Sequence, residues 1–251
     1  MGGPSVAAWA LEIDMRTCNL VLAILIACSH VMSDRVAAAA DDERASLSEL
    51  IEKLANKNKI PPKEGAKAYP IWPRGYDWTE HDRIRDAIKE LNARAGEDMA
   101  ELVNHLGDRR YCATIASPSG AYNDWTVGRV CEYILRVNVE PFQLPGDKRF
   151  DSYMPAYSGG DRVKRLQQWW KDRRDKSLMD LQLEAIEHTR DSTKRHLEGA
   201  DDNAKRNRFR EDLEHLEKLK DEIEETGEPI PRGAIHDGFH VPEKHPVQSE
   251  R

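Results

Sequence analysis

The strongest constraint on the fold is the recurrence of apolar residues at helical spacing through most of the chain. One such stripe lies on a helix that we expect over 79–95, and its members are Ile84, Ala87, Ile88, Leu91 and Ala95. Similar spacing returns over 47–55, 98–106, 127–135, 163–170, 178–186 and 209–223. No run with an apolar residue at every second position is present, apart from a few residues around Ile115. We therefore predict an all-α fold, in which antiparallel helix pairs stack or form an irregular bundle.

Polar residues at the ends of these stripes predict where the helices begin and end. Thr79, Thr126 and Ser177 each precede a stripe, and their hydroxyls can accept a hydrogen bond from a free amide of the first turn. Gly227 follows the last stripe, where a glycine commonly ends a helix.

An apolar run near the N-terminus indicates export. Met15 and Arg16 precede a nearly continuous apolar segment that ends at Cys28 and is too short to span a bilayer. The segment 1–14 is acidic and carries no Lys or Arg, so we expect translation to begin at Met15. A retained short anchor or a buried helix is the alternative to a cleaved signal.

Two ways of processing this signal are compatible with the sequence. Small residues before Asp41 would allow cleavage after Ala40 and plain secretion. The segment 25–28, Leu-Ile-Ala-Cys, resembles the lipobox of bacterial lipoproteins, in which Cys28 would become an acylated N-terminus. Either way we expect an exported protein, in the periplasm, at the cell surface or secreted, with lipid anchoring in the second case.

Cys112 and Cys131 are the cysteines that remain after the signal, and in an oxidising compartment they predict a disulfide. Closing a loop of this size would stabilise the fold by about 3 kcal/mol in the chain-entropy account. Half of a metal site, or a reactive thiol, is the alternative. That alternative would need His or Cys partners at ligand spacing, and none lie nearby in sequence.

Composition predicts four regions in the chain. The segment 1–40 is the N-terminal extension with the signal, and 44–145 is a helical subdomain that the disulfide would staple. A stretch rich in Gly, Tyr and Pro separates it from a charged helical subdomain over 158–228. The tail over 229–251 has no apolar periodicity, which predicts disorder.

Aromatic residues in two loops are the strongest candidates for a ligand platform. They are Trp72 and Trp78 in the loop 69–78, and Tyr122 and Trp125 in the loop 117–125. Rings of this kind could bind carbohydrate, and the alternative function is therefore an envelope carbohydrate-binding module or hydrolase. The simpler interpretation is that the rings pack over a helical core.

Charge and motifs exclude several other functions. The net charge of −7, with no clustered basic excess in the helices, does not predict a nucleic-acid partner. The chain lacks the short motifs of zinc proteases, serine hydrolases, phosphate loops and dinucleotide folds. His236, His240 and His245 lie in the expected disordered tail, without a core to position them. We therefore expect no catalytic residue, no metal site and no cofactor.

One resemblance bears on function. The helix pair from Thr79 to Leu106, the segment 110–112 and the segment 125–131 resemble HEAT-type helix pairs of exported bacterial all-helical proteins, over about residues 79–141. In such pairs a Val-Gly at a helix start, here Val127 and Gly128, lets the helix approach its neighbour closely. A second copy at the period of 40–47 residues expected for a solenoid is not found.

The resemblance implies an interaction scaffold and supplies no catalytic residue. Together with the signal, it leads us to expect an exported helical protein-interaction scaffold rather than an enzyme. Its partner would be a protein, and its contact with a membrane would be limited to the signal or the lipid anchor.

Overall fold

The structure, a computed structural model, describes residues 44–66, 69–116, 121–142, 152–155 and 161–230. The predicted signal, Cys28 and the cleavage site at Ala40 lie outside the described residues, as does the predicted disordered tail beyond Ile230. The chain divides into two units, Met1–Ala45 and Ser46–Arg251, and the fold is that of the second unit.

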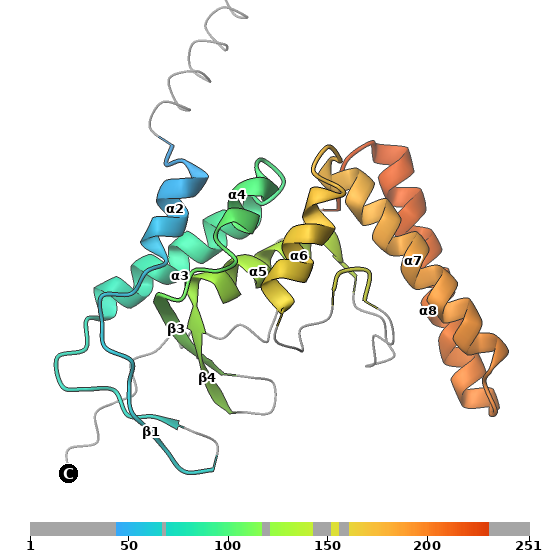
Figure 1. The fold of residues 1–251 in the computed structure, drawn as a ribbon. Helices are drawn as coiled ribbons and strands as arrows, with labels where there is room; N and C mark the ends of the chain where they lie inside the picture. The colour runs from blue at the N-terminus through green and yellow to red at the C-terminus, as the bar shows by residue number, and fades with distance from the viewer. Residues whose placement is uncertain (1–43, 67–68, 117–120, 143–151, 156–160, 231–251) are drawn as a thin grey trace, which may run out of the picture. The chain divides into compact units, whose positions relative to one another are not determined.

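The described residues are mostly helical, and about 58% of them lie in helices (Figure 1). The helices are α2 (Leu47–Lys53), α3 (Trp78–Ala93), α4 (Met99–Asn104), α5 (Val127–Val139), α6 (Arg162–Lys171), α7 (Leu178–Glu198) and α8 (Asn203–Thr226). The strands are β1 (Lys63–Glu64), β2 (Tyr69–Pro70), β3 (Tyr111–Ala116) and β4 (Tyr122–Thr126). They form two antiparallel pairs, β1 with β2 and β3 with β4. The prediction of a purely all-α fold is therefore wrong, although the helical class is confirmed.

The β3–β4 hairpin was not predicted because β3 is buried on both faces and therefore lacks the alternation of apolar and polar residues that marks a strand. Residues Cys112, Ala113, Thr114 and Ile115 of β3 are all buried, so no apolar-polar alternation marks the strand. Such a short run cannot be told from part of a buried helix by its pattern alone. The polar residues of β4 are typical of a turn, yet they pair with β3 from Tyr122 to Thr126.

Most predicted helix boundaries are confirmed, and one is wrong. Thr126 and Ser177 accept hydrogen bonds as N-caps of α5 and α7, and Gly227 ends α8 at φ 67. The cap of α3 is Asp77 rather than Thr79, and its carboxylate accepts from the Glu80 amide at 3.1 Å. Asp77 is the cap because the helix begins two residues earlier than predicted, with Trp78 inside it.

The apolar stripes of α2 to α5 face one another in the N-terminal half of the unit. All five stripe residues predicted over 84–95 are buried, as are Leu50, Ile51 and Leu54 at α2. Helix α5 is in contact with α3, α4 and both strands of the hairpin, and α2 packs against α3. Helix α5 is thus the central element of this half.

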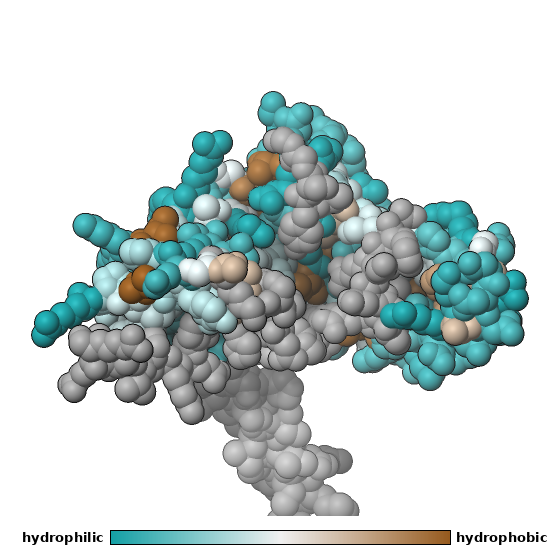
Figure 2. Space-filling model, turned by 90° about the horizontal axis from the view of Figure 1, so that it is seen from below, coloured by the Kyte–Doolittle hydropathy of each residue, from teal (hydrophilic) through white to brown (hydrophobic). Residues whose placement is uncertain are grey.

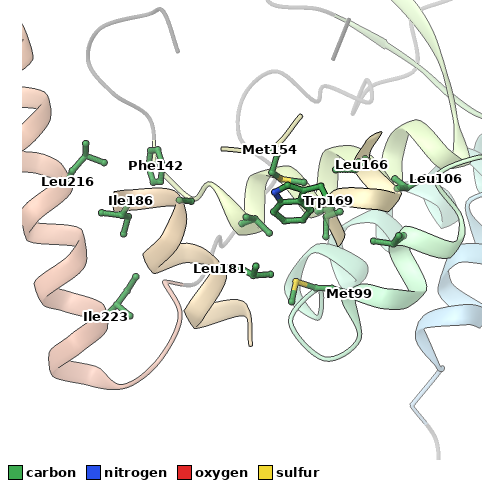
Figure 3. Packing of buried hydrophobic residues seen from close by; sticks show 14 residues of the cluster. Met99, Leu106, Phe142, Met154, Leu166, Trp169, Leu181, Ile186, Leu216 and Ile223 are labelled. Atoms are coloured by element: carbon green, nitrogen blue, oxygen red, sulfur yellow. The ribbon is translucent and has the colours of Figure 1, made fainter. Parts of the chain in front are cut away.

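A second cluster of buried apolar residues extends from α4 and α5 to α8 (Figure 3). It includes Met99, Leu106, Met154, Trp169, Leu181 and Leu216. The adjacent Trp169 and Trp170 differ in burial: Trp169 is 7% exposed and belongs to the cluster, while Trp170 is partly buried and packs against it. Since the cluster has members on both sides of 145–158, the two predicted subdomains pack against each other. The division of this unit into two subdomains stays a prediction.

Helices α7 and α8 form an antiparallel hairpin with ion pairs between them. Arg190 pairs with Glu217 at 3.0 Å, and Glu187 pairs with Lys220 at 2.9 Å. In these pairs the residue number increases along α7 as it decreases along α8, so the two helices are antiparallel.

Buried polar side chains of α5 hold the later segments of the chain. Glu132, 2% exposed, accepts from Arg136 at 3.0 Å and from Arg162 at 3.0 Å. Glu140, also 2% exposed, accepts from the Ser152 hydroxyl at 2.7 Å and the Met154 amide at 3.2 Å. These contacts satisfy carboxylates that would otherwise be costly to bury.

Candidate functional site

Residues 55–76, between α2 and α3, form an arm that contains the β1–β2 ribbon (Figure 1). The ribbon has the register Lys63↔Pro70 and Glu64↔Tyr69. The Ile71 amide donates to the Pro62 carbonyl at 2.7 Å and continues the pairing by one step. Gly65 has φ 75, a conformation that glycine adopts without steric cost. The arm is therefore a structured ribbon rather than an irregular loop.

The two faces of this ribbon differ in exposure. Alternate residues on one face are buried or half-buried, namely Pro61, Lys63, Pro70 and Trp72. The residues between them are all exposed, and we call them the outer face: Ile60, Pro62, Glu64, Tyr69 and Ile71. This is the period-two pattern of a strand pair with one covered side.

The outer face is unusually apolar. Ile60 is 51% exposed, Tyr69 51% and Ile71 49%, and they are the exposed large hydrophobic side chains of the part of the chain that the structure describes. Figure 2 shows separate apolar areas on a molecular face that is otherwise mostly hydrophilic. Single exposed apolar residues are ordinary, whereas their concentration on one face of one ribbon indicates a contact surface.

The inner face of the ribbon is tied to the β3–β4 hairpin. The Lys63 ammonium lies 2.6 Å from Oδ2 of Asp124. The other carboxylate oxygen of Asp124, Oδ1, accepts a hydrogen bond from the Thr114 hydroxyl at 2.7 Å. Thr114 in turn lies 2.9 Å from the Tyr111 hydroxyl, and burial raises the pKa of Tyr111. This chain of polar contacts fixes the ribbon relative to the core.

The two ends of the arm are joined by hydrogen bonds. The Asn58 side chain donates to the Asp77 carbonyl and accepts from the Asp77 amide, both at 2.9 Å. Asn56 donates to the Cys112 carbonyl at 2.8 Å. The arm is therefore a closed loop with a fixed neck, which preorganises its outer face.

An aromatic cluster fills the base of the arm. Its members are Trp72, Tyr76, Trp78 and His81, with ring centroids of neighbouring pairs 4.7 to 6.1 Å apart. The Trp72 and Trp78 rings are tilted by 56°, and Tyr76 meets both edge-on. These are packing geometries, and no two of the three rings lie parallel as a flat sugar platform would require.

The four predicted platform residues therefore do not form one site. Trp72 and Trp78 are 5.1 Å apart in the aromatic cluster. Tyr122 lies beside Tyr69 instead, with centroids 5.7 Å apart. Trp125 packs against Tyr133 at 5.6 Å under the Arg129 guanidinium at 4.7 Å. All four are half-buried, which agrees with the packing interpretation.

Ile60, Tyr69 and Ile71 are not among the platform residues predicted from the sequence, although Tyr69 and Ile71 lie in the predicted loop 69–78. A signal was available, since Ile60 and Pro62, like Tyr69 and Ile71, are spaced by two around a turn that contains Gly65. Prolines within the segment concealed it, because proline is unfavourable in a central strand but is tolerated in an edge ribbon.

The arm also has a charge opposite to that of the whole chain. Residues 55–76 contain five basic residues, Lys57, Lys59, Lys63, Lys67 and Arg74, and a single acid, Glu64, in a chain of net charge −7. Lys57, Lys59 and Arg74 are exposed. The arm therefore joins an apolar face to a local positive charge.

Two carboxylates that could be candidates for acid–base chemistry, Glu80 and Glu184, have structural partners. Glu80 is 7% exposed and packs against the arm, where it accepts from the Lys57 amide at 3.0 Å. The neighbouring His81, 1% exposed, lies 3.3 Å from the Tyr76 hydroxyl. Arg83 hydrogen bonds lower the pKa of Glu80. The pKa of Glu184 is also lowered overall. Burial acts to raise it, but hydrogen bonds from Lys176 and Tyr153, together with the charges of Lys176 and Arg173, have the larger effect. Neither carboxylate has the raised pKa of a general acid.

Cys112 and Cys131 are free thiols in the structure, and both are buried. The predicted disulfide is therefore absent from it, and the cysteines sit in the core as small apolar side chains. Burial raises the pKa of Cys131 to about 12 and also raises that of Cys112, to which Cys131 adds an electrostatic contribution. Thiols of this kind are poor nucleophiles. For the exported protein the disulfide stays a prediction.

Within the residues that the structure describes, no group of three or more His, Cys, Asp or Glu is placed to hold a metal ion. None of the helices from α2 to α8 is long and apolar enough to cross a membrane.

Comparison of the chain with protein-family models, with curated proteins and with solved structures found no match.

Proposed function

We propose that this chain is an exported helical interaction scaffold of the periplasm or cell envelope, which works by contact rather than catalysis. The observation that carries the proposal is the outer face of the arm, where the exposed large hydrophobic side chains of the described residues gather. The helical unit behind it acts as the support. The closed neck of the arm and the ion pair of Lys63 with Asp124 hold that face in one orientation.

The arrangement of polar residues supports binding over catalysis. Glu80 and Glu184 are held in the ionised form by cationic partners. The thiols of Cys112 and Cys131 are buried with raised pKa. The tilted packing of Trp72 and Trp78 likewise gives little support to the alternative of a carbohydrate-binding module or hydrolase. The sequence predicts a protein partner for the scaffold, and the outer face by itself does not specify the class of molecule that it contacts.

A photocrosslinking experiment in a native-like host tests this function. A photoreactive phenylalanine analogue would replace Tyr69, with the same analogue at the exposed Glu211 of α8 as the matched control. We expect an adduct from position 69 that is absent from position 211 and weakened by Ile60→Ser with Ile71→Ser. Equal adducts at both positions, or none at position 69, would contradict a contact surface on the arm.

A further inference from the structure

We propose that the outer face of the arm binds the surface of an anionic phospholipid bilayer. The inference rests on the proposed function and names the partner of its contact surface. It also differs from the sequence prediction, in which a membrane is reached only through the signal or a lipid anchor.

The side chains of the outer face suit the boundary between lipid headgroups and hydrocarbon. Ile60 and Ile71 would place aliphatic groups in the apolar layer, and each is about half exposed in water. Tyr69 has an apolar ring with a polar hydroxyl, the combination that is enriched at membrane interfaces. The ribbon offers a shallow projecting face, and such a face can enter a fluid layer without needing a matching cavity in the partner.

The charge around this face, with three exposed basic residues against the single acid Glu64, is complementary to anionic lipid. Lys57 and Lys59 precede Ile60 by three residues and one residue, and Arg74 lies four residues after the end of β2. Among the described side chains no salt bridge to these three residues is found, and the charge of Lys57 also lowers the pKa of Glu80. Basic residues beside an anionic surface each add to binding, and long lysine stems let the ammonium stay at the phosphates while the apolar groups insert. The acidic remainder of the chain would be repelled, which selects the arm as the part that docks.

The same composition argues against a protein partner for this face. Lysine is depleted in the cores of protein–protein interfaces, where arginine and tryptophan are enriched. Four of the five basic residues of the arm are lysines. A stable protein interface also uses about 20–30 residues on each side, far more than the five of the outer face.

The face is built before any contact is made. Asn58 and Asp77 close the neck, and Lys63 with Asp124 holds the inner side of the ribbon. Little conformational freedom would therefore be lost on docking, and a small surface can contribute usefully to binding.

Vesicle cosedimentation tests the inference on the full chain purified from a native-like host. Vesicles of phosphatidylcholine with phosphatidylglycerol would be compared with vesicles of phosphatidylcholine alone, at low and high salt. We expect binding to the anionic vesicles that weakens with salt. An acyl group at Cys28 would bind both kinds of vesicle, so the preference for phosphatidylglycerol is the readout of the arm.

Two pairs of substitutions locate the contact. Lys57→Glu with Lys59→Glu should weaken binding to the anionic vesicles by about 30-fold or more, since each basic residue near such a surface contributes about fivefold. Ile60→Ser with Ile71→Ser should weaken it at unchanged charge. The matched control is Lys171→Glu with Lys218→Glu, a charge change at exposed sites of α6 and α8. Melting curves would show that each variant is folded, and the two arm pairs serve as independent tests.

Three results would overturn the inference: equal binding to both kinds of vesicle, unchanged binding in both arm pairs, or an equal loss in the control. If vesicles are not bound but position 69 crosslinks to a protein, the lipid partner is wrong and the proposed function stands. If neither vesicle binding nor an adduct is found, both are wrong.

Discussion

A methyl group on Gly128 would lie 2.4 Å from the carbonyl oxygen of Leu106. Helix α5 therefore starts in direct contact with the backbone that follows α4, and the Gly128 amide donates to the Asp108 carbonyl at 3.0 Å. The close approach that the Val-Gly pair implies is present at this position.

Gly128→Ala should destabilise the protein, although alanine is normally the better helix former by up to about 1 kcal/mol. The added methyl group must displace backbone, and we expect a loss of about 1–3 kcal/mol in the free energy of unfolding. Urea denaturation measures it. Gly107→Ala is the matched control, because nothing lies within 4 Å of its added methyl group. Equal effects at both positions would refute this account of the packing.

The buried carboxylate of Glu132 should be among the most sensitive positions in the chain. Glu132→Ala would remove the buried carboxylate that both Arg136 and Arg162 contact, and we expect a loss of about 3–5 kcal/mol in unfolding free energy. Glu217→Ala, which removes an exposed partner of Arg190, should cost about 1 kcal/mol or less. Chemical denaturation of both variants compares them, and similar losses would contradict a structural role for the α5 network.

The stability contributed by Glu80 should depend on pH. Its hydrogen bonds with Arg83 hold the pKa below the ordinary 4.5, so the carboxylate stabilises the fold above 4.5. This contribution is lost as the pH falls through the lower value of the folded state.

Glu80→Gln should therefore lower stability near neutral pH by about 1–3 kcal/mol, the usual worth of hydrogen bonds to a charged group. Its difference from the parent protein should shrink below pH 4.5. Thermal melts across pH measure this, with Glu211→Gln on α8 expected to behave like the parent protein. A difference that stays constant into acid would show that the charge of Glu80 does not contribute.

Intact mass of the protein from a native-like host tests the predicted export. We expect a chain that begins at Asp41, or one that begins at Cys28 and carries diacylglycerol. An uncleaved chain would refute the export on which the envelope location depends.

The same sample tests the predicted disulfide between Cys112 and Cys131. Under denaturing conditions we expect uptake of two alkyl groups only after reduction, and reduction should lower the unfolding free energy by about 3 kcal/mol. Denaturing conditions are needed because Cys112 and Cys131 are both buried, so even free thiols should not react in the native state. Two alkyl groups without reduction would instead show that the free thiols of the structure persist after export.

The candidate site on the arm could be predicted only in part from the sequence. Its aromatic residues stand out in the sequence, and Trp72 and Trp78 do lie together. The pairing of β1 with β2 decides which side chains of the arm pack inward, and it leaves Ile60, Tyr69 and Ile71 exposed. Strand pairing brings together residues on the two sides of a turn and decides which face of the ribbon is covered. The local sequence pattern, which prolines interrupt, does not reveal this pairing.

The helical class, the inward stripes of the main helices and most of their ends could be predicted from the residues alone. These features depend on local spacing and on side chains that cap their own helix, so three or four neighbouring residues contain the information. The β3–β4 hairpin, the burial of Glu80, Glu132 and the thiols, and the apolar outer face of the arm became evident only in the folded chain. Each of these depends on contact between segments distant in the chain, and the energy of such contact is set by what covers a residue rather than by its neighbours in sequence.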